Sequence, residues 1–104
     1  MEVRALDEIK KLCDSIVELV SPEKIILFNQ KVTLDWKVSS FKVCVIANGN
    51  PAEIEGEIYL STDCPIHFDV LVYSSEDWEK YILDADSFAH RIWETGSVIY
   101  GEER

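Results

Sequence analysis

The chain has 104 residues, a length that fits one domain built around a single hydrophobic core. Hydrophobic residues make up 47% of it and charged residues 29%, which is the composition of a globular protein and excludes a disordered chain. There are 20 Asp and Glu against 10 Lys and Arg, so the formal net charge is −10. A surface this acidic repels polyphosphate backbones and anionic lipid, so we expect neither direct nucleic-acid binding nor membrane binding.

The cysteines and the N-terminal residues predict the cellular compartment. Cys13, Cys44 and Cys64 form no metal-ligand spacing, and their odd number favours reduced thiols. From Met1 the sequence opens into a charged helical pattern instead of the basic and then apolar leader of a signal peptide. No apolar run approaches the roughly 20 residues that span a bilayer. We therefore expect a cytoplasmic protein.

The first half of the chain predicts one helix and two strands. Apolar residues recur at steps of three and four over residues 3–20, which is the spacing of an amphipathic helix. Residues 24–28 form a short, nearly all-apolar run, which favours a strand buried on both faces. Residues 29–40 are polar and irregular, so we expect a loop there. Residues 41–47 predict a second strand, whose side chains alternate between the two faces of a sheet.

The second half continues this alternation. Turn residues precede a predicted helix over 52–60, and a third strand is predicted over 66–73. Two helices are expected after this strand, the first starting at Ser74-Ser75-Glu76-Asp77 and the second capped by Asp86-Ser87. Gly96 stands where a helix end favours a residue with positive φ. A last short strand is predicted over 97–100.

Helices and strands thus follow one another in the order α-β-loop-β-α-β-α-α-β. The sequence contains no internal repeat, linker or low-complexity tract that would divide it, so we expect one domain over residues 1–104. This order predicts an α/β (α+β) fold in which helices cover a small mixed sheet of about four strands.

Five stretches carry a pattern that points to a family. Residues 22–30 read Pro-Glu-Lys-Ile-Ile-Leu-Phe-Asn-Gln, residues 40–46 form an apolar strand, and residues 67–72 place one Asp inside an apolar run. Ser-Phe at 87–88 and Ile-x-x-x-Gly-x-x-x-Tyr at 92–100 follow. Taken in this order, the stretches resemble the minimal nucleotidyltransferases of the DNA polymerase β-like superfamily. The resemblance covers nearly the whole chain and implies the fold of that family.

The departures from the family pattern concern its chemistry. The resemblance implies a Gly-Ser turn that lets the backbone approach nucleotide phosphates, but Asn29 and Gln30 stand at those positions. It also implies an Asp-x-Asp pair that holds divalent ions, and here the two positions are Phe41 and Val43. The acidic residue of the family's third strand is matched by Asp69.

These replacements remove the ligands that the reaction needs. Mg²⁺ requires oxygen ligands in near-octahedral geometry, and in nucleotide-transfer sites it lies between carboxylates and phosphates. Phenyl and isopropyl groups supply no lone pairs, and nucleotidyl transfer depends on positioning and charge neutralisation. We therefore predict a catalytically inactive member of the family with no cofactor.

Asp69 remains the one candidate metal ligand. We expect it to share a strand face with His67 and to lie opposite Phe41 and Val43. A polar strand residue that is satisfied by backbone amides, a nearby Lys or water is the favoured interpretation, because single carboxylates in proteins are usually paired or hydrogen-bonded. We therefore predict that no Mg²⁺ or Mn²⁺ binds there at millimolar concentrations.

Other polar residues are candidates for the same site. His67 and Asp69 could form a general-base pair, but no nucleophile stands beside them, and a surface histidine is favoured. Asp35 and Asp63 lie in predicted loops and could replace the missing carboxylates, although loops hold a site less firmly than strands do.

Lysine, cysteine and tryptophan residues complete the set of candidates. The lysines around the expected phosphate cleft either bind an anion or are simply solvated. Cys44 is expected to face away from Asp69 as a buried apolar residue. Two tryptophans fit the core faces of their helices, and the third either is exposed at an interface or covers the cleft. The lysines are Lys31, Lys37 and Lys42, the core tryptophans are Trp78 and Trp93, and the third is Trp36.

The first functional hypothesis is an interaction protein. In the family that the chain resembles, such domains are commonly partnered with a small all-helical protein called HEPN, as the antitoxin of a bacterial or archaeal pair. An acidic antitoxin that masks a basic RNA-cutting partner is electrostatically reasonable. A homodimer is a further alternative, because exposed sheet edges can pair between two copies of the chain.

Two alternatives belong to other functional classes. In the first, Asp69 and loop carboxylates form a rearranged metal site, and an active enzyme uses Mg²⁺ and ATP to move a nucleotidyl group to a protein hydroxyl. In the second, the domain is a sensor that binds a nucleotide without reacting with it.

Overall fold

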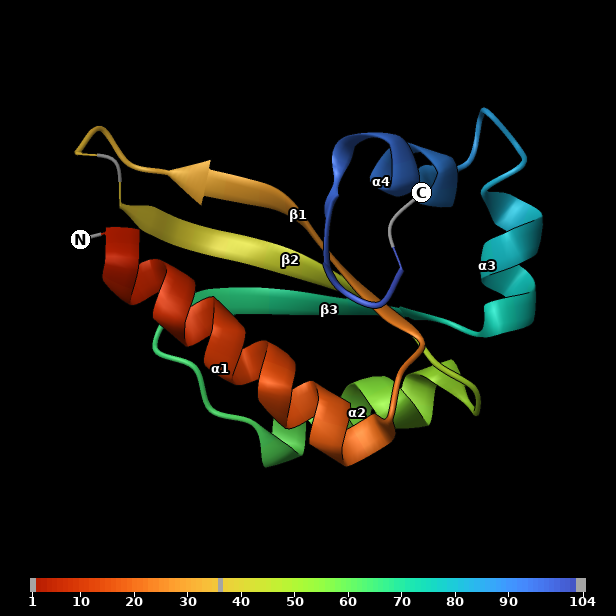
Figure 1. The fold of residues 1–104 in the computed structure, drawn as a ribbon, viewed down its shortest axis with the longest axis horizontal. Helices are drawn as coiled ribbons and strands as arrows, with labels where there is room; N and C mark the ends of the chain where they lie inside the picture. Colours follow the sequence, from red (N-terminus) through yellow and green to blue (C-terminus); the bar gives the residue numbers. More distant parts are fainter. Residues whose placement is uncertain (1, 36, 103–104) are drawn as a thin grey trace.

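The computed structural model describes residues 2–35 and 37–102, and Figure 1 shows how their helices and strands are arranged. In chain order the elements are α1 (Glu2–Val20), β1 (Lys24–Val32), β2 (Val38–Ile46), α2 (Pro51–Ser61), β3 (His67–Tyr73), α3 (Ser75–Tyr81), α4 (Phe88–Thr95) and β4 (Ser97–Tyr100). The predicted succession of helices and strands is confirmed. Within the described residues, no helix is both long and apolar enough to cross a bilayer.

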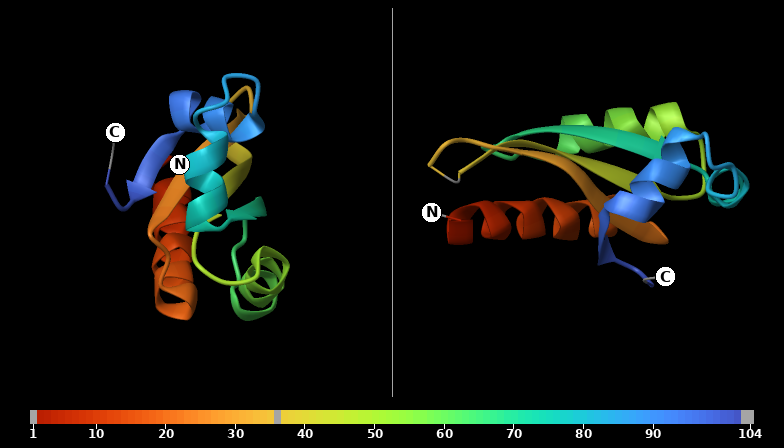
Figure 2. Two further views of the ribbon diagram at one scale, coloured as in Figure 1. Left: turned by 90° about the vertical axis from the view of Figure 1, so that its right-hand side faces the viewer. Right: turned by 90° about the horizontal axis from the view of Figure 1, so that it is seen from above.

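The strands form one mixed sheet in the order β3-β2-β1-β4. β1 runs antiparallel to both of its neighbours, and β2 runs parallel to β3. The left view of Figure 2 shows α1 and α2 below the sheet and α4 above it. The prediction of a small α+β domain, with helices covering a mixed sheet, is therefore confirmed.

The sheet face that α1 and α2 cover carries the larger hydrophobic cluster. α1 contributes its predicted apolar stripe, and it ends at Val20 because Ser21 takes a φ of 47° and is followed by Pro22. Each fully buried aliphatic side chain contributes roughly 1.5–3 kcal/mol to stability. The buried members are Ile9, Leu12, Cys13, Ile16, Ile25, Leu27, Phe41, Val43, Val45, Ala47, Ile58, Val70 and Val72.

The face under α3 and α4 has a smaller buried cluster. Trp78 of α3 is 4% exposed, and its ring meets the ring of Trp93 edge to face at 6.0 Å. The prediction of a core position is confirmed for Trp78, and Trp93 is partly buried and packs against the same cluster. Trp36 lies outside the described residues. The buried members are Ile26, Phe28, Cys44, Ile46, Trp78, Ala89 and Ile92.

The expected loop over residues 29–40 is wrong at both of its ends, where the chain is strand. β1 and β2 both extend into this stretch and form a hairpin that projects from the body of the domain (Figure 1). Asn29 has a φ of 53°, and the pairing shifts register between Phe28 and Lys31, so β1 continues past a bulge. The outer residues of β1 are exposed, so the apolar–polar alternation that reveals a half-buried strand is missing from the sequence.

The expected positive φ of Gly96 is also wrong. Its φ is −82°, which any residue can adopt. A Cβ atom at this position would lie 2.6 Å from Cγ2 of Ile26 and 2.7 Å from the carbonyl oxygen of Ile92. Glycine is therefore required because the chain passes close to β1, where β4 joins the sheet.

Candidate functional site

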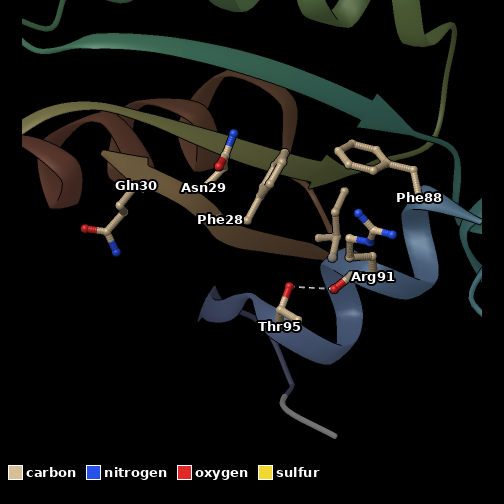
Figure 3. A pocket seen from close by; sticks show the side chains of 7 residues that line it. Phe28, Asn29, Gln30, Phe88, Arg91 and Thr95 are labelled. Atoms are coloured by element: carbon tan, nitrogen blue, oxygen red, sulfur yellow. Dashed lines mark hydrogen bonds between the residues drawn. The ribbon is translucent and has the colours of Figure 1, made fainter. Parts of the chain in front are cut away.

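The sheet face that carries α3 and α4 also carries two adjoining hollows. The larger one measures about 550 Å³ and lies between β1 and α4 (Figure 3). The smaller one measures about 220 Å³ and lies over β2 and β3. Both are lined by Phe28 and Phe88, and we call the two hollows together the Phe28–Phe88 groove. The other lining residues are Asn29, Gln30, Arg91, Ile92 and Thr95 in the larger hollow and Lys42, Asp69, Val70 and Leu71 in the smaller.

One face of α4 forms a wall of the groove. As predicted, Ser87 caps this helix, because its side-chain oxygen accepts a hydrogen bond from the backbone N–H of His90 at 3.0 Å. Phe88, Arg91 and Thr95 follow at helical spacing and line the larger hollow. Arg91 and Thr95 were not among the predicted site residues, although their spacing after the capping serine places them on one helix face.

The middle of β1 forms the opposite wall. Phe28 is 8% exposed and Phe88 is 53% exposed, and their rings meet edge to face at 5.9 Å. Asn29 and Gln30, which replace the Gly-Ser turn expected from the resemblance, lie inside β1 and not in a turn. Figure 3 shows their side chains pointing to opposite sides of the strand. Both residues line the larger hollow, at the point where the pairing of β1 with β2 shifts register.

Asp69 lies in the smaller hollow beside a lysine. Its cross-strand neighbour on β2 is Lys42, and the neighbour of His67 is Ser40. Cross-strand neighbours project from the same face of a sheet, so a hydroxyl and an ammonium group share the face of Asp69. Asp69 and His67 are both exposed, and the expectation of a surface histidine is confirmed.

The expected position of Asp69 opposite Phe41 and Val43 is wrong. Phe41 is the cross-strand neighbour of Phe68, and Val43 is the neighbour of Val70. Phe41 and Val43 are each 1% exposed and belong to the cluster under α1 and α2. Because side chains alternate along a strand, these two residues point away from the groove, and the groove is not filled by them.

The loop carboxylates do not join Asp69. Asp35 lies in the hairpin connection, where the hydroxyl of Thr33 donates to it and Lys37 Nζ lies 3.7 Å from Oδ2. The hydrogen bond from Thr33 lowers the pKa of Asp35. Asp63 lies between α2 and β3. In the part of the chain that the structure describes, His, Cys, Asp and Glu side chains form no group of three or more that could hold a metal ion.

The three candidate lysines are separated. Lys42 lines the groove, whereas Lys31 lies on an exposed arm of the hairpin and Lys37 lies at its end. Cys44 is fully buried, as expected, and burial raises the pKa of its thiol to about 12. It does not face away from the side of Asp69, because its cross-strand neighbour Leu71 lines the same hollow. The expected direction of Cys44 is therefore wrong.

Comparisons with protein-family models, with curated protein sequences and with solved structures give no match to this chain.

Proposed function

We propose that the chain is a catalytically inactive protein of the nucleotidyltransferase type that acts as a protein-interaction module. The order of the five resembling stretches along a small α+β domain supports this assignment. Its proposed partner is a helical protein of the HEPN type, with this chain as the antitoxin-like member of the pair.

The proposal of inactivity rests on the side chains beside Asp69. A metal clamp that includes Asp69 needs further carboxylates from the positions of β2 that face it. Those positions hold Ser40 and Lys42. A hydroxyl is a weak ligand without charge, and an ammonium group repels a divalent cation. The chemistry at this point of the sheet therefore opposes Mg²⁺ binding.

The acidic surface supports a protein partner with a basic face. Leu60 of α2 is 89% exposed and stands near the exposed acidic residues Glu53 and Glu57. Leu83 is 85% exposed and is followed directly by the exposed Asp84. Apolar side chains surrounded by acidic groups are suited to an interface that combines apolar burial with charge complementarity.

The interaction is tested by purifying the tagged full-length chain from cells that produce it naturally. We expect a stoichiometric companion that is small, helical and basic and that is released as the ionic strength rises. Glu53→Lys and Glu57→Lys should weaken its retention, whereas the matched change Glu79→Lys on α3 tests whether the effect is local. Elution of the chain alone at its natural abundance would contradict the proposal.

The inactivity is tested by metal titration of four proteins. The wild type and Asp69→Asn should show no saturable Mn²⁺ binding at millimolar concentrations. The double variant Ser40→Asp/Lys42→Asp should gain such binding, because it places carboxylates beside Asp69, and adding Asp69→Asn to it should weaken the binding again. Saturable binding by the wild type that Asp69→Asn abolishes, or transfer of label from ATP to a protein, would favour the enzymatic alternative.

A further inference from the structure

Two cations stand at opposite parts of the Phe28–Phe88 groove. Arg91 lines the larger hollow and Lys42 lines the smaller, and the two aromatic rings are common to both hollows. Within the described residues, neither cation takes part in an ion pair. Figure 3 shows the guanidinium of Arg91 pointing toward the two rings. The groove therefore presents one cation on each side of an aromatic surface, and Asp69 adjoins the cation of the smaller hollow.

This arrangement contrasts with the rest of the chain. The net charge is −10, and Asp69 is the one acidic residue among those that line the two hollows. An acidic ligand is repelled by the molecule as a whole, so it binds only where cations are locally concentrated. Charge complementarity thus favours an anionic occupant in this groove and opposes it elsewhere.

The free edge of β1 favours a polypeptide as that occupant. β4 pairs with Ile25, Ile26 and Leu27, and no described strand pairs with the rest of β1 on that side. The larger hollow begins at the next residue, Phe28, so the backbone of an extended segment can approach β1 there. A small anion would use the cations alone and would gain nothing from the free edge.

We propose that the Phe28–Phe88 groove binds an extended acidic segment of a protein partner. An apolar side chain of the segment rests on the exposed ring of Phe88, and acidic residues on either side of it reach Arg91 and Lys42. Carboxylate–guanidinium contacts are charge-assisted and directional, so Arg91 is expected to contribute more than Lys42. This inference deepens the proposed function and rests on it, because it names the chemistry of one part of the partner.

The test is selection from a displayed library of random heptapeptides against the full-length chain. A parallel selection uses the double variant Arg91→Glu/Lys42→Glu. The matched control is Lys10→Glu/Lys11→Glu, which makes the same change in net charge at two exposed residues of α1. Peptides that are enriched on the wild type should carry Asp or Glu on both sides of an aromatic or aliphatic residue.

Synthetic versions of the enriched peptides then give the affinities. Arg91→Glu/Lys42→Glu should weaken binding by about tenfold or more, whereas the α1 control should stay within about twofold of the wild type. Phe88→Ala, at an exposed position, should also weaken binding while leaving the fold intact. Amide chemical shifts of the wild type should change at Phe28 and Arg91.

Three results would overturn the inference. They are the absence of peptides enriched on the wild type over the groove variant, enrichment of peptides without acidic residues, and tighter binding of ATP or inorganic phosphate than of the peptides. The proposed function fails separately, if the chain elutes alone from the cells that produce it. If the natural partner is captured equally well by the wild type and the groove variant, the interaction module stands and the acidic segment is excluded.

Discussion

The two faces of the sheet differ in how completely they are covered. The face under α1 and α2 buries an unbroken set of apolar side chains from three strands. The face under α3 and α4 has a smaller buried cluster and leaves Lys42, Asp69 and the ring of Phe88 accessible. The same strands serve both faces, because successive side chains alternate between them.

This difference separates stability from binding. On the closed face, a polar group would lose its hydration without gaining a partner, so apolar residues are required there. On the open face, charged groups keep their hydration and remain available to a ligand. Substitutions at neighbouring residues of β2 therefore have different consequences. One changes the stability of the fold, and the next changes the chemistry of the groove.

The largest expected effect is the contrast between two neighbouring residues of β2. Phe41→Asp should lower the free energy of unfolding by about 4 kcal/mol or more, because it removes a 1% exposed ring and buries a carboxylate. Lys42→Asp should change it by less than about 1 kcal/mol, because Lys42 lies at the edge of an open hollow. Urea denaturation of both variants measures the contrast, and equal losses would contradict the assignment of faces.

A smaller effect is expected where β4 joins the sheet. Gly96→Ala should cost about 1–3 kcal/mol, because its Cβ would lie 2.6 Å from Ile26 and 2.7 Å from a backbone oxygen. Gly56→Ala is the control, since a Cβ there meets nothing within 4 Å and alanine favours the helix. Thermal denaturation should show a lower midpoint for the first variant and an equal or higher one for the second. A neutral Gly96→Ala would mean that β4 shifts at little cost.

The smallest expected effect concerns the cap of α4. Ser87→Ala removes the acceptor for the backbone N–H of His90 and should cost about 1 kcal/mol. The helix also positions Phe88 and Arg91, so binding to the groove should weaken with it. Ser87→Thr keeps the acceptor and also the hydroxyl that donates to the carbonyl oxygen of Tyr81, so it should recover both properties. Recovery of stability without recovery of peptide binding would separate the cap from the groove.

Most of the helices and strands could be predicted from the sequence. The helical periodicity of residues 3–20, the apolar run at 24–28 and the capping residues before α3 and α4 each predict the element that forms there. These signals are local, because the spacing of the apolar residues within a helix or a buried strand shows which of its sides is buried. The hairpin arms gave no such signal, since they are exposed and irregular.

The site depended on tertiary structure. Whether Asp69 faces Phe41 or Lys42 depends on the register between β2 and β3, and a shift of one residue exchanges every neighbour. The proximity of Phe28 to Phe88 depends on how α4 packs against β1, across sixty residues of sequence. Local patterns decide which face of an element is apolar, whereas contacts between distant elements arise only from the packing of those faces in three dimensions.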